Sequence, residues 1–266
     1  MINQKINILL LHSSNDLYGA SKIFLQLIDL FTSKDFNVHV VLPEEGMLDD
    51  FLIKKDIKIE YLELGVLRKK YLNPLGLINR LVANVKAIAF LSNYIKDHSI
   101  DLVYTNTSTI LCGGIAAKRT GVPSLFHVHE IPTGNKLYEF FSGKIINRYS
   151  SKILTVSNSV KKHWLKYIDD KKIERIYNGI VFSKTNSLIK LERDQDDFVI
   201  TSVARIIPYK GHGYLIDIAD KLIKKSIKFK FLIVGDTLSS YFSYEKSVKK
   251  KVKDLGLEHQ IKFLGF

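Results

Sequence analysis

The sequence predicts an α/β protein with two parallel-sheet domains. Short runs of apolar and β-branched residues alternate along the chain with segments whose apolar residues recur at helical spacing, which is typical of strands followed by helices. This alternation occurs in two series, and 266 residues with 46% hydrophobic content can form two modest cores. We therefore expect a first domain over residues 1–182, a linker over residues 183–196 and a second domain over residues 197–266.

Composition limits the class of protein. The 40 basic and 27 acidic residues give a formal net charge of +13, which attracts phosphorylated ligands, anionic lipid or nucleic acid alike. The sequence lacks zinc-ligand spacing, an aromatic RNA-binding motif and a basic-zipper heptad, so we expect no nucleic-acid partner. The single Cys112 excludes an internal disulfide and fits a reducing cytoplasm. The longest apolar segment, residues 75–95, is interrupted by charged and amide side chains, so we expect no membrane span.

The first domain begins with a strand and a glycine-containing turn. Residues 6–11 form an apolar run typical of a strand buried on both faces, and apolar spacing predicts a helix over residues 22–31. Gly19, Ala20 and Ser21 lie at the turn between them, where free backbone amides can face an anion. The turn has no GxGxxG motif, which argues against an ordinary NAD domain. A glycine that serves only the turn is the alternative.

Further strands and helices continue this pattern. Strands are expected over residues 38–42, 57–62, 102–105, 124–128 and 152–156, and helices over residues 46–55, 75–98 and 111–119. Gly113 and Gly114 in the last of these helices indicate close packing, and Ser157 or Ser159 can cap a helix that follows. The segment from Arg68 to Leu75 combines cations with a tyrosine, so it is either an exposed loop or a contact with an anionic bilayer.

Two histidines mark the end of the strand over residues 124–128. Strand alternation places His127 and His129 on one face, and the carboxyl end of a parallel strand is where side chains reach a ligand. Three interpretations remain open: a metal site that includes Glu130, a general base, and a structural histidine with satisfied hydrogen bonds. Further along, Asn178 and Gly179 predict a turn near the end of the first domain.

The second domain opens with a strand–helix–strand unit over residues 198–236. Its first loop contains Arg205 and Lys210, five positions apart, followed by Gly211. A guanidinium can hold two phosphate oxygens, an ammonium adds a point charge, and glycine lets backbone amides come close, so the loop suits a diphosphate. Solvated charges on a turn are the alternative. The unit ends at Gly235 and Asp236, and a lysine-rich helix is expected over residues 244–255 with Val248, Val252 and Leu255 on its apolar face.

These motifs together resemble family 4 retaining glycosyltransferases, also called group 1. SVARIIPYKGHGYLIDIADKL followed by FLIVGD is similar to the start of that family's second domain, and YGAS, HVHE and IYNGI are similar to motifs of its first domain. The resemblance covers nearly the whole chain. It implies the GT-B fold, in which two Rossmann-like parallel-sheet domains face a cleft, and here the second domain is expected to be incomplete, with about three strands.

The resemblance also implies roles for individual residues. Arg205 and Lys210 would bind the diphosphate of a nucleotide-sugar donor, and His129 would contact the transferred sugar; we expect these three to be catalytic. The other donor-binding residues implied by the resemblance are Gly19, Ala20, Glu130, Asn178, Gly211, Gly235 and Asp236. The sequence departs from the family in having one glycine instead of two at Gly19 and none after Asp236.

The resemblance implies a glycosyltransferase that moves a sugar, with retention, from a nucleoside-diphosphate sugar to a glycan or glycolipid acceptor in polysaccharide biosynthesis. We expect no cofactor and no metal; the DxD pattern at residues 194–196 precedes a strand instead of ending one and is interpreted as linker charge. We expect a cytoplasmic protein that can also lie at the inner, anionic face of the plasma membrane. The alternative is a catalytically incomplete nucleotide-sugar-binding or scaffold subunit, because the family's carboxyl-terminal glutamate pair has no counterpart in these 266 residues.

Overall fold

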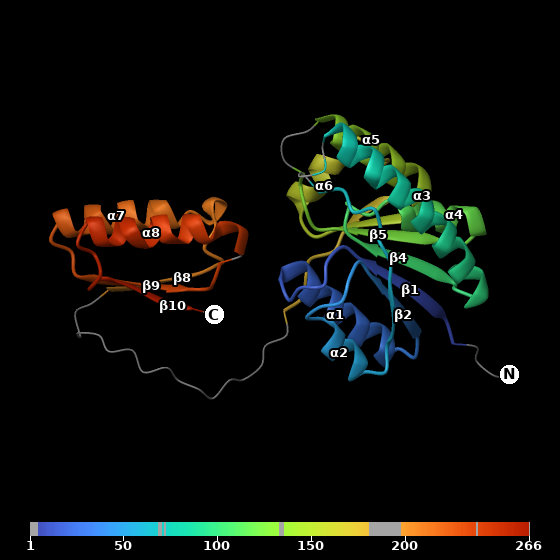
Figure 1. Ribbon diagram of the computed structural model, residues 1–266, viewed down its shortest axis with the longest axis horizontal. Coiled ribbons are helices and arrows are strands. Elements are labelled where there is room, and N and C mark those ends of the chain that lie inside the picture. Colours follow the sequence, from blue (N-terminus) through green and yellow to red (C-terminus); the bar gives the residue numbers. More distant parts are fainter. Residues whose placement is uncertain are drawn as a thin grey trace. The chain divides into compact units, whose positions relative to one another are not determined.

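The structure is a computed structural model that describes residues 5–68, 71, 73–132, 136–180, 198–237 and 239–265. The chain divides into two compact units, Met1–Phe182 and Ser183–Phe266. Each unit is an α/β body with its own parallel sheet (Figure 1). The predicted fold class is therefore confirmed, whereas the predicted linker and its DxD pattern lie outside the described residues.

The first unit contains a seven-stranded parallel sheet in the order β3-β2-β1-β4-β5-β6-β7. The strands are β1 (Asn7–His12), β2 (Asn37–Leu42), β3 (Lys58–Tyr61), β4 (Leu102–Asn106), β5 (Ser124–Val128), β6 (Lys152–Thr155) and β7 (Ile173–Arg175). The order reverses between β1 and β4, as in doubly wound folds, so β1, β4 and β5 are neighbours. Residues that end these three strands are consequently brought to the same edge of the sheet.

Helices cover both faces of this sheet (Figure 1). They are α1 (Gly19–Ser33), α2 (Asp49–Ile53), α3 (Pro74–Asp97), α4 (Cys112–Thr120), α5 (Lys136–Tyr149) and α6 (Asn158–Trp164). Alternate residues of β1 enter two different cores: Leu9 and Leu11 pack with α3 and α4, whereas Ile8 and Leu10 pack with α1. Burial on both faces explains why β1 is apolar without interruption.

Close packing of α4 on the sheet depends on its glycines. A Cβ added at Gly113 would lie 2.3 Å from Leu11 Cδ1 and 2.7 Å from Thr105 Oγ1, and one at Gly114 would lie 2.7 Å from the Phe126 ring. Any larger residue would have to push these buried side chains apart. The expectation from the sequence that the two glycines permit close packing is confirmed.

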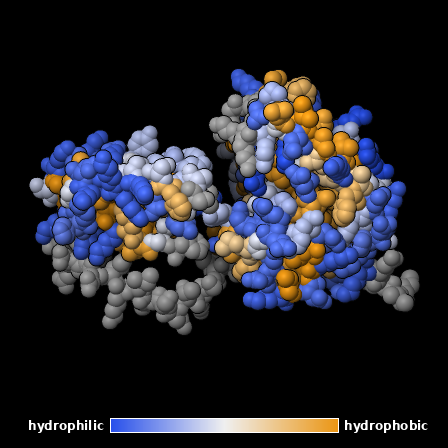
Figure 2. Space-filling view, viewed as in Figure 1, coloured by the Kyte–Doolittle hydropathy of each residue, from blue (hydrophilic) through white to orange (hydrophobic). Residues whose placement is uncertain are grey.

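Helix α3 is half core and half surface. Its buried residues all lie from Ala83 onward, whereas Leu75, Ile78 and Leu81 in its first half are 81%, 61% and 65% exposed. Figure 2 shows apolar side chains gathered over this part of the first unit. Within the described part of the chain, α3 alone is long and apolar enough to cross a membrane by length and composition.

The second unit contains a three-stranded parallel sheet, β10-β9-β8, with two longer helices on one face (Figure 1). Its elements are β8 (Phe198–Val203), η2 (Pro208–Lys210), α7 (His212–Lys224), β9 (Phe229–Val234), η3 (Ser239–Tyr241), α8 (Phe242–Asp254) and β10 (Ile261–Gly265). Ile216 of α7 and Val248 and Val252 of α8 pack on Phe231 and Ile233 of β9. The predicted strand–helix–strand unit is confirmed.

Several details predicted from the sequence are wrong. Residues 176–180 are irregular and form no turn at Asn178–Gly179, since the chain runs on from the short edge strand β7. Leu255 is 42% exposed because α8 ends at Asp254 and the chain reverses at Gly256, whose φ is 64°. The apolar residues Leu77, Leu81 and Val85, which helical spacing in the sequence places on the apolar faces of this helix, are exposed in α3. Helix α5 and strand β7 were not predicted.

Three strand histidines are buried in the first unit: His12, His39 and His127. His12 is 1% and His127 is 4% exposed. Burial lowers the pKa of His12 to about 4 and that of His127 to about 3, because an imidazolium loses its hydration there. Both rings are therefore neutral near pH 7.

His12 and His127 predict that the first unit loses stability as the pH falls from 7 to 5. An unfolded histidine takes up a proton near pH 6.5, whereas the folded rings do so only near pH 4 and 3, so protonation in this window favours the unfolded chain. Each ring should lower the free energy of unfolding by about 2 kcal/mol. Chemical denaturation followed by the fluorescence of Trp164, the single and fully buried tryptophan, measures this. The variant His127→Asn should show a weaker pH dependence; equal stability of the native chain at both pH values would contradict the prediction.

Candidate active site

Polar side chains from three neighbouring strands meet at the carboxyl edge of the first sheet. His12 and Asn106 end β1 and β4 and are register partners, and His129 and Glu130 follow β5. We call His12, Asn106, His129 and Glu130 the strand-end cluster. It lies where parallel α/β sheets bind their ligands.

Asn106 connects the two rings of the strand-end cluster. Its Nδ2 donates to His12 Nδ1 at 3.1 Å, and its Oδ1 accepts a hydrogen bond from His129 Nε2 at 2.8 Å. His12 Nε2 in turn donates to Ser21 Oγ at 2.9 Å, and Ser21 Oγ donates to Asp16 Oδ1 at 2.7 Å. In this series of hydrogen bonds, each group donates to the next one, from the His129 ring through Asn106, His12 and Ser21 to the Asp16 carboxylate.

The direction of these hydrogen bonds determines which ring nitrogen of His12 and of His129 carries the proton. His12 accepts at Nδ1 and donates from Nε2, which is the arrangement of a neutral imidazole. His129 carries its proton on Nε2, so its Nδ1 can accept a hydrogen bond from another group. Burial lowers the pKa of His129, opposed by the nearby Glu130 carboxylate, so His129 is also neutral near pH 7.

Glu130 supports the loop after β4. Its Oε1 accepts hydrogen bonds from Thr107 Oγ1 at 2.8 Å, Ser108 N at 2.8 Å and Ser108 Oγ at 2.6 Å, and its Oε2 accepts one from the backbone of His129 at 3.2 Å. Trp164 Nε1 donates to the Glu130 carbonyl at 3.1 Å. The side chain that contacts the His129 ring is that of Asn106 and not that of the adjacent Glu130.

His127 belongs to the core and not to the site. Its Nδ1 and the Tyr104 hydroxyl share a hydrogen bond of 2.7 Å, and its ring centroid lies 4.2 Å from that of His129. The two histidines do lie together, as strand alternation predicted. In the described ranges, no group of three or more His, Cys, Asp and Glu side chains is arranged to hold a metal ion.

Helix α1 begins at Gly19, beside the strand-end cluster. The Ala20 carbonyl accepts a hydrogen bond from Asn106 Nδ2 at 3.3 Å, and Asp16 Oδ1 accepts one from the Tyr18 amide at 3.0 Å. The amino end of α1 is thereby fixed to Asn106. An added Cβ at Gly19 would meet nothing within 4 Å, so packing inside the chain does not require a glycine there.

The cationic loop of the second unit, residues 204–211, lies at the carboxyl edge of its sheet. Arg205 is half-buried and Lys210 is exposed. Gly211 has a φ of 78°, in the left-handed region that favours glycine, and α7 begins immediately after it. Tyr209 and Tyr241 share a hydrogen bond of 2.8 Å between their hydroxyls, which joins this loop to the one after β9.

Gly235 lets the loop after β9 lie against the cationic loop. Its φ is 139°, and an added Cβ would lie 2.2 Å from the Ala204 carbonyl oxygen. Ile206 N donates to the Asp236 carbonyl at 2.7 Å, and Thr237 Oγ1 donates to the Ile206 carbonyl at 2.8 Å. The structure thus brings Arg205, Lys210, Gly211, Gly235 and Asp236 to one edge of the second sheet.

The residues implied by the sequence therefore fall into two groups, one on each unit. Gly19, Ala20, His129 and Glu130 gather at the strand-end cluster, whereas Asn178 is exposed in the irregular segment after β7. Sequence reasoning missed His12, Asn106, Ser21 and Asp16. Two of them could have been found, since a polar residue ends each of the apolar strands β1 and β4.

Comparison with known proteins agrees with this architecture. A galactosyltransferase of Escherichia coli that acts on α-D-GlcNAc-diphosphoundecaprenol with UDP-Gal is 26% identical over 274 residues, which cover 92% of this chain and 67% of that protein. The structure of Anabaena HepE in complex with UDP and glucose superposes with a TM-score of 0.73 and 22% identity over 98% of this chain and 69% of that one. A glycosyltransferase of Rickettsia africae gives a TM-score of 0.75 at 22% identity, over 98% of this chain and 68% of that one.

Two family profiles match consecutive parts of the sequence. Glycosyltransferase Family 4 matches residues 18–184, and Glycosyl transferases group 1 matches residues 183–266. The first profile alone spans more than half of the chain. The protein therefore belongs to the family 4, group 1 glycosyltransferases of the GT-B fold.

Proposed function

We propose that this glycosyltransferase moves a sugar from a UDP-sugar to a lipid-linked saccharide in the synthesis of a polysaccharide, with retention at the anomeric carbon. The observation that carries the donor part is the cationic loop, where Arg205 and Lys210 precede the first turn of α7 at the carboxyl edge of a parallel sheet. The E. coli relative uses UDP-Gal and a diphospholipid-linked GlcNAc, which supports the donor and acceptor classes.

The diphosphate is the leaving group, and its growing negative charge is the main chemical burden of the transfer. Arg205 can hold two of its oxygens, Lys210 adds an ammonium, and the amino end of α7 favours an anion. These groups can balance the charge without a metal ion. We therefore propose a metal-independent reaction.

His129 is proposed to bind the transferred sugar. A neutral ring that donates from Nε2 to Asn106 keeps its Nδ1 as an acceptor for a sugar hydroxyl. Asn106 and His12 are positioning residues. Asn106 Oδ1 accepts the hydrogen bond from the His129 ring, and His12 Nδ1 holds the Asn106 amide in the orientation that this requires. The same Asn106 amide reaches the Ala20 carbonyl, so the start of α1 is positioned together with His129.

We also propose that the protein associates peripherally with the cytoplasmic face of an anionic bilayer through the exposed first half of α3. Leu75, Ile78 and Leu81 offer an apolar surface, and the net charge of +13 favours anionic lipid. An enzyme bound to this surface would meet a lipid-linked acceptor that is anchored in the same bilayer.

If the cationic loop binds the donor diphosphate, removal of its arginine should lower the affinity for UDP-sugars. Arg205→Ala should weaken binding of UDP-galactose or UDP-glucose by about 10- to 100-fold, since one charge-assisted hydrogen bond is worth roughly 1.5–3 kcal/mol. Isothermal titration calorimetry in EDTA measures this. Lys246→Ala, which removes an exposed cation of α8, is the control and should leave the affinity unchanged. Loss of native binding in EDTA would contradict metal independence, and equal affinity of Arg205→Ala would contradict the assignment of the loop.

The strand-end cluster predicts a change in the pH dependence of transfer. In Asn106→Asp, a carboxylate beside both rings should raise the pKa values of His12 and His129, so that each becomes protonated at a higher pH. The acidic limb of the kcat profile should move to higher pH by about one unit or more. Asn106→Gln would perturb packing without adding a charge, so its limb should stay in place. A profile that is lowered evenly in both variants would indicate a purely structural role.

The α3 surface predicts membrane binding. The double variant Ile78→Asp, Leu81→Asp should sediment with phosphatidylglycerol vesicles at least about tenfold less than the native chain, because each change removes roughly 1 kcal/mol or more of apolar burial and adds negative charge. Ile180→Asp, which alters an apolar side chain of the first unit that is 74% exposed, is the control. Failure of the native chain to sediment at low salt would overturn this part of the proposal.

A further inference from the structure

A pocket of about 360 Å³ lies beside the strand-end cluster and has no part in the function described so far. Segments that follow β2 and β3, and residues at the start of α3, form its walls. The lining residues are Pro43, Glu44, Glu63, Leu64, Gly65, Val66, Arg68, Tyr71 and Arg80. We call this the β2–β3 pocket.

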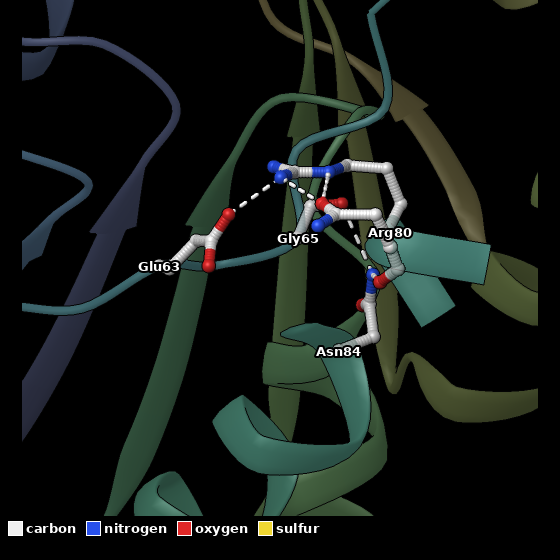
Figure 3. Close-up of polar contacts among 5 residues, drawn as sticks. Glu63, Gly65, Arg80 and Asn84 are labelled. Carbon is white, nitrogen blue, oxygen red and sulfur yellow. Dashed lines mark hydrogen bonds and ion pairs between the residues drawn. The ribbon is translucent and has the colours of Figure 1, made fainter. Parts of the chain in front are cut away.

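One wall of the β2–β3 pocket is held in a fixed conformation by α3 (Figure 3). Arg80 Nη2 donates to Glu63 Oε1 at 2.5 Å, and the Arg80 guanidinium lies 4.3 Å from the centre of the Tyr71 ring. Asn84 Nδ2 donates to the carbonyls of Gly65 at 3.0 Å and Arg80 at 2.9 Å. With a φ of 61°, Gly65 needs to be glycine, and an added Cβ would lie 2.1 Å from the Asn84 amide.

The opposite end of the pocket reaches the strand-end cluster through hydrogen bonds. Arg68 Nη2 donates to the carbonyl of Ser13, the residue after His12, at 2.9 Å. Leu67 N donates to the Thr109 carbonyl at 3.0 Å, in the loop that Glu130 holds through Thr107. The pocket and the strand-end cluster therefore share one edge of the first sheet and are connected by the residues between them.

The chemistry of the lining indicates a neutral polyhydroxylated ligand. Arg68 and Arg80 supply donors in fixed directions, and Glu44 and Glu63 supply acceptors, so the four formal charges cancel. A phosphate would meet two carboxylates here, and an apolar ligand would leave the charged groups unpaired. A sugar ring can use both donors and acceptors. The volume of about 360 Å³ lies within the usual range of roughly 300–1,000 Å³ for small-molecule sites.

We propose that the β2–β3 pocket binds the sugar of the acceptor, the saccharide that receives the transferred group. This rests on the proposed function, since it names the acceptor subsite of the same reaction. Glu63 and Arg80 determine which hydroxyl pattern fits, because their ion pair is fixed against Tyr71 and α3. The exposed apolar residues of α3 begin a short distance along the chain from Tyr71, so a lipid attached to that sugar finds apolar surface beside the pocket.

The test compares acceptor and donor binding in the full chain. Glu63→Gln keeps the size of the side chain and removes its charge; the Glu63 side chain is 64% exposed, so the variant should fold. Saturation-transfer NMR with methyl glycosides of glucose, galactose and N-acetylglucosamine reports acceptor binding, and calorimetry with UDP-galactose and UDP-glucose reports donor binding. Glu45→Gln, an exposed glutamate outside the pocket, is the matched control.

The expected result is that one glycoside binds the native chain and Glu45→Gln equally but Glu63→Gln at least about tenfold more weakly, with UDP-sugar affinity unchanged in all three. Equal glycoside binding by Glu63→Gln, or donor binding without glycoside binding in the native chain, would overturn the acceptor pocket and leave the proposed function standing. If the native chain bound neither UDP-sugar nor glycoside, the proposed function itself would fail. The variant Arg80→Lys should also bind this glycoside more weakly than the native chain does. Trp164 fluorescence checks that the variant is folded.

Discussion

The site in the first unit depends on one planar amide. Asn106 donates to one imidazole and accepts from another, so a single rotamer determines the tautomer of both. This works because β1, β4 and β5 are adjacent and parallel, which brings the ends of three strands within hydrogen-bonding distance of each other. A charged residue in place of the amide would leave one ring with the wrong partner. The site therefore needs both the strand order of the sheet, which brings the two rings to Asn106, and an amide, which can donate to one ring and accept from the other.

Burial gives this arrangement its electrostatic character. The rings of His12 and His127 are almost fully enclosed, and desolvation lowers their pKa values so far that they remain neutral near pH 7. The same environment strengthens hydrogen bonds between neutral groups. The cost is lower stability in acid.

The second unit uses a different device. Its candidate site consists mainly of backbone and two flexible cations, and Gly235 makes it possible by allowing two loops to approach within van der Waals distance. Arg205 and Lys210 follow a strand and precede a helix, so their positive charge and the amino end of α7 lie at the same edge of the sheet. One unit therefore offers a preorganised hydrogen-bond network, in which two neutral imidazoles and an amide lead to the Asp16 carboxylate, and the other offers positive charge. The proposed sugar recognition and diphosphate stabilisation require these two properties.

The sequence by itself determined the fold class, the family and most of the strands and helices, although not α5 and β7. It also placed Arg205 and Lys210 in the loop after one strand and His129 directly after another. Each of these follows from local information: apolar periodicity, glycine in turns and short motifs along the chain. The tertiary structure alone decided that the side chain of Asn106, and not that of the adjacent Glu130, contacts the His129 ring, because Asn106 and His129 are 23 positions apart and meet only when β4 pairs with β5. It also decided that the first half of α3 is exposed and that Glu63 and Arg80 form one wall of a pocket. Periodicity shows that a helix has an apolar stripe, but which part of the stripe is covered depends on neighbours that are distant in the sequence.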